Sequence, residues 1–221
     1  TLRAAIQETN ALAGANTVYL PAGTYTLTRA GADEDQGASG DLDIRDNLTI
    51  IGSGQVTIDA GQLDRVFDVA DGKTLTLRGV TVTGGKTTSL GGGLRNAGGT
   101  VIVEQATFSG NEAGSGGALA NLLDGILIVR SSTVSGNTAS TGGAVLNDDS
   151  TVTITSSTVT ANTATQAGGL ANLSGTVNLK NTIIAGNTAS SANPDVSGAI
   201  ASVGNNLVGI VGNATGLANG N

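Results

Sequence analysis

TVIVEQATFSGNEAGSGGALAN (residues 100–121), ILIVRSSTVSGNTASTGGAVLN (126–147) and TVTITSSTVTANTATQAGGLAN (151–172) are three versions of one sequence that follow each other along the chain. Asparagines mark this repeat in two series, and every step within a series is 25 or 26 residues. The first series is Asn111, Asn137, Asn162 and Asn187, and the second is Asn96, Asn121, Asn147 and Asn172. Repeat periods between about 20 and 50 residues are typical of solenoids, propellers and arrays.

Each repeat contains two short apolar runs and a third run behind a polar corner. In the third copy these runs are 151–155, 158–160 and 168–171. Their alternation predicts strands in which the apolar residues face one way and the threonines the other. Three such strands with their turns fill one period, so each repeat forms one turn of a three-sided coil whose strands pair in parallel with the next coil. The prediction is an all-β parallel β-helix, because the leucine-rich frame is absent and a propeller blade needs about 40 residues.

The period also predicts the register of the coils. Six triplets are expected to stack as the first face: 48–50, 75–77, 101–103, 127–129, 152–154 and 177–179. The run Val80 to Thr83 and its successors are expected to form the second face. In the same register Glu104 aligns with Arg130, Thr155 and Lys180, so this outward ladder alternates in charge and contains no pair of acids.

The two asparagine series are interpreted as structural. A solenoid corner turns sharply in every coil, and glycine or asparagine tolerates the left-handed backbone such a turn needs. Asparagines at equivalent corners can also stack their side-chain amides, as they do in cross-β ladders. The alternative interpretation is that one of the two series lines a ligand groove.

Composition excludes several classes of protein. The chain has 221 residues, a net charge of −7, and neither cysteine nor histidine. It therefore has no disulfide and no thiolate metal site, and it lacks histidine, the usual general base and the commonest metal ligand. The absence of a basic cluster argues against nucleic acid as a partner, and the absence of an 18-residue apolar run argues against membrane insertion.

The expected organisation is a single domain over residues 1–221. Residues 1–13 have helical spacing, with Thr1 as N-cap and Gly14 as the stop, and are predicted to cap the open end of the apolar column. Residues 14–47 are predicted to hold the first coils, with strands at 17–20 and 24–28 separated by a turn at 21–23, and an acidic loop. Regular coils follow over 48–204, and 205–221 are predicted to be a last strand and a tail.

Several segments resemble secreted bacterial proteins with a Cys-Ser-Leu-Arg-Glu-Ala-type N-terminal motif. They are TLRAAI (1–6), NTVYLPAGTYTLT (16–28), EDQGASGDLDI (34–44), LTIIGSG (48–54), DRVFDV (64–69), NTASSANPDVSG (187–198) and NNLVG (205–209). The Phe/Val-x-x-Asn and Gly-Gly-Ala-Leu/Val elements also resemble the repeats of polymorphic outer-membrane autotransporters. The resemblance implies a right-handed β-helix that is exported to the cell surface or beyond, often as part of a longer chain, and implies no catalytic residues. Ala4 stands where the family has Glu, so a reciprocal capping box with Thr1 is not expected.

The acidic loop is the candidate metal site. Asp33, Glu34, Asp35, Asp41 and Asp43 lie close together in a stretch rich in glycine and alanine. Clustered carboxylates suit a hard cation, and outside the cell Ca²⁺ is the candidate. The alternative is a solvated loop whose charge is partly offset by Arg45. Arg65 follows this region and is expected to brace a corner by pairing with a carboxylate, with carbohydrate clamping as its alternative role.

Function is predicted to be structural or adhesive, with assembly end to end, and without catalysis. A glycan lyase or hydrolase needs several carboxylates on one face, and the acids beyond residue 72 are scattered. A polysaccharide-binding or polysaccharide-cleaving protein is one alternative. The other is ice binding by the pairs Thr81/Thr83, Thr107/Ser109, Thr133/Ser135 and Thr158/Thr160, a hydroxyl array that ends at Ile183/Ala185. The expected partners are other protein domains, copies of the same chain, or a glycan.

Overall fold

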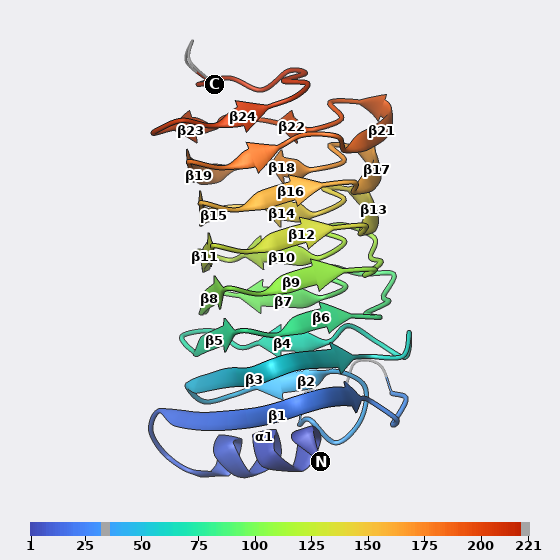
Figure 1. Cartoon of the computed structure of the whole chain (residues 1–221), viewed down its shortest axis with the longest axis vertical. Coiled ribbons are helices and arrows are strands. Elements are labelled where there is room, and N and C mark those ends of the chain that lie inside the picture. The colour runs from blue at the N-terminus through green and yellow to red at the C-terminus, as the bar shows by residue number, and fades with distance from the viewer. Residues whose placement is uncertain (32–35, 218–221) are drawn as a thin grey trace.

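The chain folds into a column of stacked parallel strands, in a computed structural model that describes residues 1–31 and 36–217. The column has about six turns of roughly 26 residues each, and one helix lies across its N-terminal end (Figure 1). This confirms the predicted all-β parallel β-helix. The only helix of the described residues is too short and too polar to cross a membrane.

The first face is formed by the strand that opens each coil. Leu48, Leu75, Val101, Leu127, Val152 and Val177 pair consecutively, which confirms the predicted register. Alternate residues point into the core because side chains alternate along a strand. The strands are β3 (Leu48–Asp59), β5 (Thr74–Arg78), β8 (Thr100–Glu104), β11 (Ile126–Arg130), β15 (Ser150–Thr155), β19 (Gly175–Lys180) and β23 (Ala201–Ser202).

The second face is formed by three-residue and two-residue strands with a buried central or final apolar residue. They are β6 (Thr81–Thr83), β9 (Thr107–Ser109), β12 (Thr133–Ser135), β16 (Thr158–Thr160), β20 (Ile183–Ile184) and β24 (Leu207–Val208). β3 is long enough to belong to both faces, so the two faces form one 14-stranded sheet with β1 (Asn16–Thr26) beside β3.

β1 differs from the expectation of two strands separated by a turn. It runs through Pro21 to Gly23 as a single strand with only a register shift against β3. Within the described residues β1 pairs with β3 alone, and an edge strand tolerates proline because one side of its backbone needs no partner. The uninterrupted β3 offers a continuous template, so the proline makes an irregularity and not a turn.

The third face lies behind the polar corner. Its strands are β2 (Leu42–Ile44), β4 (Phe67–Val69), β7 (Leu94–Ala97), β10 (Leu119–Leu122), β14 (Val145–Asn147), β18 (Leu170–Asn172) and β22 (Val196–Ser197). The corner itself forms a small sheet that the sequence did not predict, of β13 (Thr138–Thr141), β17 (Thr163–Gln166) and β21 (Thr188–Ala192). Outward Ala120, Leu146 and Ala171 are buried with Ala167 in a second apolar cluster, so the outer side of this face is partly covered.

The N-terminal helix α1 (Leu2–Ala11) closes the column, as predicted, although it ends before residue 13. Leu2 and Ile6 join the main apolar core, which explains why the helix lies flat across the first coils (Figure 1). The Thr1 hydroxyl still accepts a hydrogen bond from the Ala4 N–H at 3.3 Å. One N-terminal donor is therefore satisfied without a glutamate at position 4.

The last coils are irregular, as the loss of the repeat pattern predicts. Strands β22 to β24 have two residues each, and the chain after them adds one isolated bridge, between Ala199 and Thr215. Residues 218–221 of the predicted tail lie outside the described residues.

The asparagine series form two continuous ladders inside the column. In the first, Nδ2 of Asn111, Asn137 and Asn162 each donates to Oδ1 of the next asparagine at 2.8–3.0 Å. In the second, the corresponding distances from Asn96, Asn121 and Asn147 are 2.7, 3.2 and 2.9 Å. All eight side chains are between 0 and 6% exposed. The amides therefore satisfy one another where water does not reach.

The backbone part of the asparagine interpretation is wrong. None of the eight has a positive φ. In the first ladder the left-handed residue is the one immediately before each asparagine, namely Gly110, Gly136, Ala161 and Gly186. The neighbour makes the turn, so that the asparagine keeps a conformation that aims its amide inward.

A third polar column, which the sequence analysis missed, lies between the first and second faces. Ser132 and Ser157 accept hydrogen bonds from the backbone N–H groups of Ala106 and Ser132, and Asn206 accepts one from Thr182. The signal was present, because Ser132, Ser157 and Thr182 recur in steps of 25 residues. Every corner of the coil thus has its own polar stack.

The side chain of Asn137 makes five hydrogen bonds within this scheme. Its Nδ2 donates to the carbonyls of Phe108 and Ser135 and to Asn162, and its Oδ1 accepts from both the backbone and the side chain of Asn111. We expect Asn137→Ala to lower the free energy of unfolding by about 2 kcal/mol or more, because buried groups left unsatisfied cost about 1–3 kcal/mol.

Chemical denaturation measures this change. Asn178→Ala is the matched control, because Asn178 is half-buried in β19 and makes no side-chain hydrogen bond within the described residues. A loss of less than about 0.5 kcal/mol for Asn137→Ala, the size of an ordinary surface change, would contradict the ladder account.

Candidate functional site

Carboxylates gather where the acidic loop joins the first coils. Asp43 lies in β2 and pairs in register with Asp68 of β4, and Asp41 directly precedes β2. One oxygen of each of these three carboxylates lies within 4.8 Å of one oxygen of both others. All three residues are buried, at 5–8% exposure. The topology therefore places charged groups from two coils in one buried cluster.

Two arginines balance part of this charge. Arg65 Nε lies 2.7 Å from Asp41 Oδ2 and 3.9 Å from Asp68 Oδ2. Arg95, one coil further along, binds both oxygens of Asp68, at 2.7 and 3.1 Å. Arg65 also donates to the carbonyl of Leu90 at 2.7 Å, so it joins two coils as a brace. The Arg65–Asp41 contact is an ion pair without a well-directed hydrogen bond from Nε.

Asp64 adds a fourth buried carboxylate to this region. Its Oδ1 accepts a hydrogen bond from the Arg65 backbone N–H. The pKa of Asp41 is raised from 3.8 to about 7, mainly by burial and next by the neighbouring Asp43, while Arg65 acts in the opposite direction. The cost of removing the charge from water outweighs the arginine here. Asp41 therefore keeps its proton to a higher pH than an isolated aspartate does.

The same region anchors the capping helix. Arg3, 8% exposed, donates from Nη1 to the carbonyls of Gly37 and Asp41 at 3.0 and 2.7 Å. Asp43 Oδ2 accepts from the Gly37 N–H at 2.6 Å, and the Asn10 amide donates to the Asp43 carbonyl at 2.7 Å. The loop, the cluster and α1 are thus one hydrogen-bonded unit.

The predicted calcium ligands fit the cluster only in part. Asp41 and Asp43 are brought together, and Asp68 joins them, whereas Asp33, Glu34 and Asp35 lie outside the described residues. Three converging carboxylates suit a hard cation. However, Arg65 and Arg95 already bind two of the three. A shallow hollow of about 260 Å³, lined in part by Asp43, Asp68 and Arg95, gives access to the cluster from outside.

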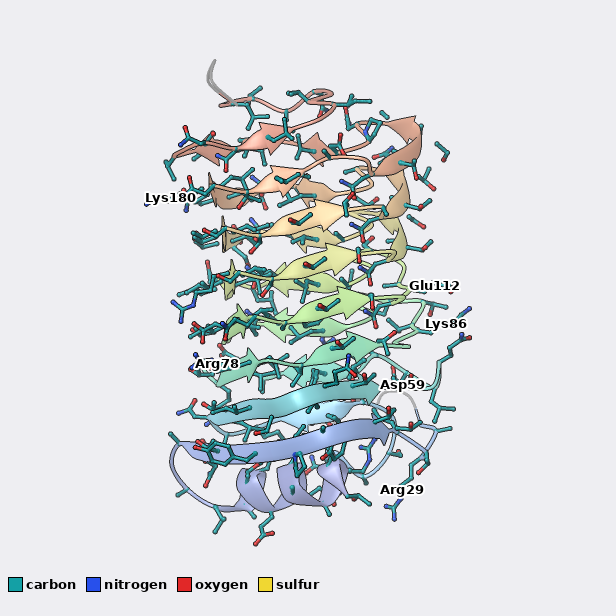
Figure 2. The ribbon with its side chains drawn as sticks, viewed as in Figure 1. Arg29, Asp59, Arg78, Lys86, Glu112 and Lys180 are labelled. Atoms are coloured by element: carbon teal, nitrogen blue, oxygen red, sulfur yellow. The ribbon has the colours of Figure 1, made fainter. Side chains whose placement is uncertain are left out.

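Among the described residues no second group of three acids converges. Glu104 forms an ion pair with Arg130, and Glu112 with Lys86 at the polar corner (Figure 2). Asp148 and Asp149 belong to a corner, where Asp149 has a φ of 48° and both bond to Ser174. The register also confirms that Arg130, Thr155 and Lys180 follow Glu104 in the outward ladder.

Comparison with known proteins adds no relative. No family model matches the chain, and no significant match was found among curated proteins or among solved structures.

The raised pKa of Asp41 predicts a pH-dependent stability. A group whose folded pKa lies above its unfolded pKa favours folding most below the unfolded value, and this contribution is lost as pH rises through the folded pKa. Between pH 5 and pH 8 we expect the free energy of unfolding to fall by about 2 kcal/mol more in the native chain than in Asp41→Asn. Chemical denaturation at both pH values checks this, and equal pH dependence of the two proteins would refute it.

Calcium binding by this region remains a prediction. A ligand that binds only the folded state raises the melting temperature by mass action. Millimolar Ca²⁺ at pH 8 is expected to raise it for the native chain and not for Asp41→Asn/Asp43→Asn. Asp148→Asn/Asp149→Asn is the control for unspecific screening of charge. A calorimetric titration of the native chain that shows no heat of Ca²⁺ binding would contradict the prediction. The region would then serve only to anchor the capping helix.

Proposed function

We propose that the chain is a structural or adhesive β-helix module of the cell surface or extracellular space, without catalytic activity. The observation that carries this proposal is how the side chains fill the interior of the column. The core is filled with apolar side chains, and the buried asparagines are engaged in ladders that leave no amide for a ligand groove. A rigid column with outward-facing short polar side chains is suited to spacing or presenting a surface.

The distribution of acids supports a non-catalytic role. Hydrolysis of a glycan needs two carboxylates that reach the same bond from an open site. In this structure the three converging carboxylates are buried and arginine binds two of them, while the outward acids Glu104 and Glu112 each pair with a basic side chain. The exported location rests on the resemblance of the N-terminal and C-terminal segments to secreted β-helix proteins.

The two ends of the described column differ. At the N-terminal end, Leu2 and Ile6 of α1 are 5% and 2% exposed. Near the C-terminal end Val203, Leu207 and Ile210 are 56, 55 and 57% exposed, and within the described residues β23 and β24 each pair with a single strand. An open strand edge with apolar side chains can add further strands. We propose that this end contacts a second copy of the chain.

Sedimentation velocity over a wide concentration range tests this assembly. We expect self-association that increases with concentration and that decreases in Leu207→Lys/Ile210→Lys. Leu123→Lys is the control, because Leu123 is 69% exposed at a corner on the side of the column. A strictly monomeric native chain would overturn the end-to-end contact, and turnover in a glycan-cleavage screen would overturn the non-catalytic assignment.

A further inference from the structure

The second face carries a two-dimensional array of hydroxyl groups. Four consecutive strands, β6, β9, β12 and β16, have a threonine or serine at both outward positions. The pairs are in strict register, Thr81 to Thr107 to Thr133 to Thr158 in one column. Thr83, Ser109, Ser135 and Thr160 form the second column. In an ideal parallel sheet such hydroxyls repeat about every 4.8 Å between strands and about 6.6 Å along a strand.

These hydroxyls are free to bind something outside the protein. None of the eight side chains has a hydrogen-bond partner within the described part of the chain. Each of them is half-buried, so part of each side chain faces the solvent. The buried serines of the neighbouring corner column, by contrast, are all engaged with the backbone. The array is therefore separate from the polar stacks that hold the coils together.

The array is rigid and uncharged. Val82, Phe108, Val134 and Val159, the central residues of the four strands, are 0% exposed and fix the strands from inside. The four strands lie one above another with little divergence (Figure 1). The labelled charges lie toward the edges of the same view, Arg78 and Lys180 on one side and Lys86 and Glu112 on the other (Figure 2). Charge enters the array only below it, at Asp59, which pairs with Thr83.

A ligand for this surface must itself be neutral, flat and periodic. A hollow of about 400 Å³ beside β6 and β9 is lined by Thr81 and Thr107 but by no residue of the second column. A small molecule in it would therefore touch only one edge of the array. A solid glycan surface is periodic, but sugar rings are usually bound by aromatic side chains, and the array has none. Both phenylalanines are fully buried, Tyr25 packs against the core, and the exposed Tyr19 pairs with Ile51 on the first face. Ice is periodic and neutral, and each of its surface oxygens can donate and accept hydrogen bonds as a hydroxyl does.

From this geometry we propose that the second face, from β6 to β16, binds the surface of ice. Each hydroxyl contributes little alone, but a rigid array engages a lattice at many points without an ordering cost. The threonine methyl groups between the hydroxyls add apolar area that is withdrawn from liquid water. The array lies on β6 to β16, whereas the contact between copies proposed above uses β23, β24 and the segment after them, so different variants test the two activities.

Adsorption to ice tests the proposal. The purified chain is expected to become enriched in a slowly growing ice hemisphere and to show thermal hysteresis, and Thr133→Tyr is expected to lose both because a bulky ring in the middle of the array prevents flat contact. Thr153→Tyr is the control, since Thr153 is half-buried and outward-facing on the first face, and it is expected to keep both activities. Circular dichroism and melting curves establish that each variant is folded.

Three outcomes would overturn the proposal. The first is that growing ice excludes the native chain as completely as it excludes serum albumin. The second is that a folded Thr133→Tyr adsorbs to ice as well as the native chain does. The third is that the Thr153→Tyr control loses as much adsorption as Thr133→Tyr. Pull-down on crystalline cellulose or chitin without enrichment in ice would assign the face to a glycan instead. Sedimentation of the same samples shows whether the end contact holds, so the two proposals can fail separately.

Discussion

The hydrogen bond between stacked asparagine amides sets the length of each coil. In the first ladder one Oδ1 accepts both the backbone N–H and the Nδ2 of the asparagine in the preceding coil, as Asn162 does from Asn137 at 3.0 and 2.9 Å. A coil that gained one residue between its corners would turn the amide away from this column, since successive side chains point to opposite faces. The observed steps of 25 or 26 residues are therefore the lengths that return each amide to its ladder, with the extra residue absorbed in a turn.

The repeat made much of the fold predictable. Register, inward residues and the stacked amides all follow from a fixed period, because each coil repeats the environment of the one before. Features that depend on contacts with segments outside the repeat pattern could not be predicted. β1 passes through Pro21 because β3 supports it, and β13, β17 and β21 pair into a corner sheet although each of these strands looks like a polar turn in the sequence.

The candidate site shows the same division. Asp43 and Asp68 lie one period apart, 25 residues, so their pairing was available from the sequence, yet the acidic loop drew attention to Asp33, Glu34 and Asp35 instead. The burial of Asp41 against Arg65 was not available, because it depends on a loop that follows no repeat and on the capping helix that holds it through Arg3. The raised pKa of Asp41 is thus a property of the cap and the first coils together.

The polarity of the first ladder also explains where the regular coils stop. Each asparagine donates toward the C-terminal end, so the last one, Asn187, needs an acceptor that no further asparagine supplies. Asp195 provides it, since its Oδ1 accepts from both the N–H and the Nδ2 of Asn187 at 2.9 and 2.8 Å, and its Oδ2 accepts from the Ile210 N–H at 2.6 Å. The residue equivalent to Asp195 in the preceding coil is Gly169. A Cβ added to Gly169 would lie 2.9 Å from Asn187 Nδ2. A side chain fits at this position only in the coil where the ladder ends, and a carboxylate is the group that accepts all three donors without offering one of its own.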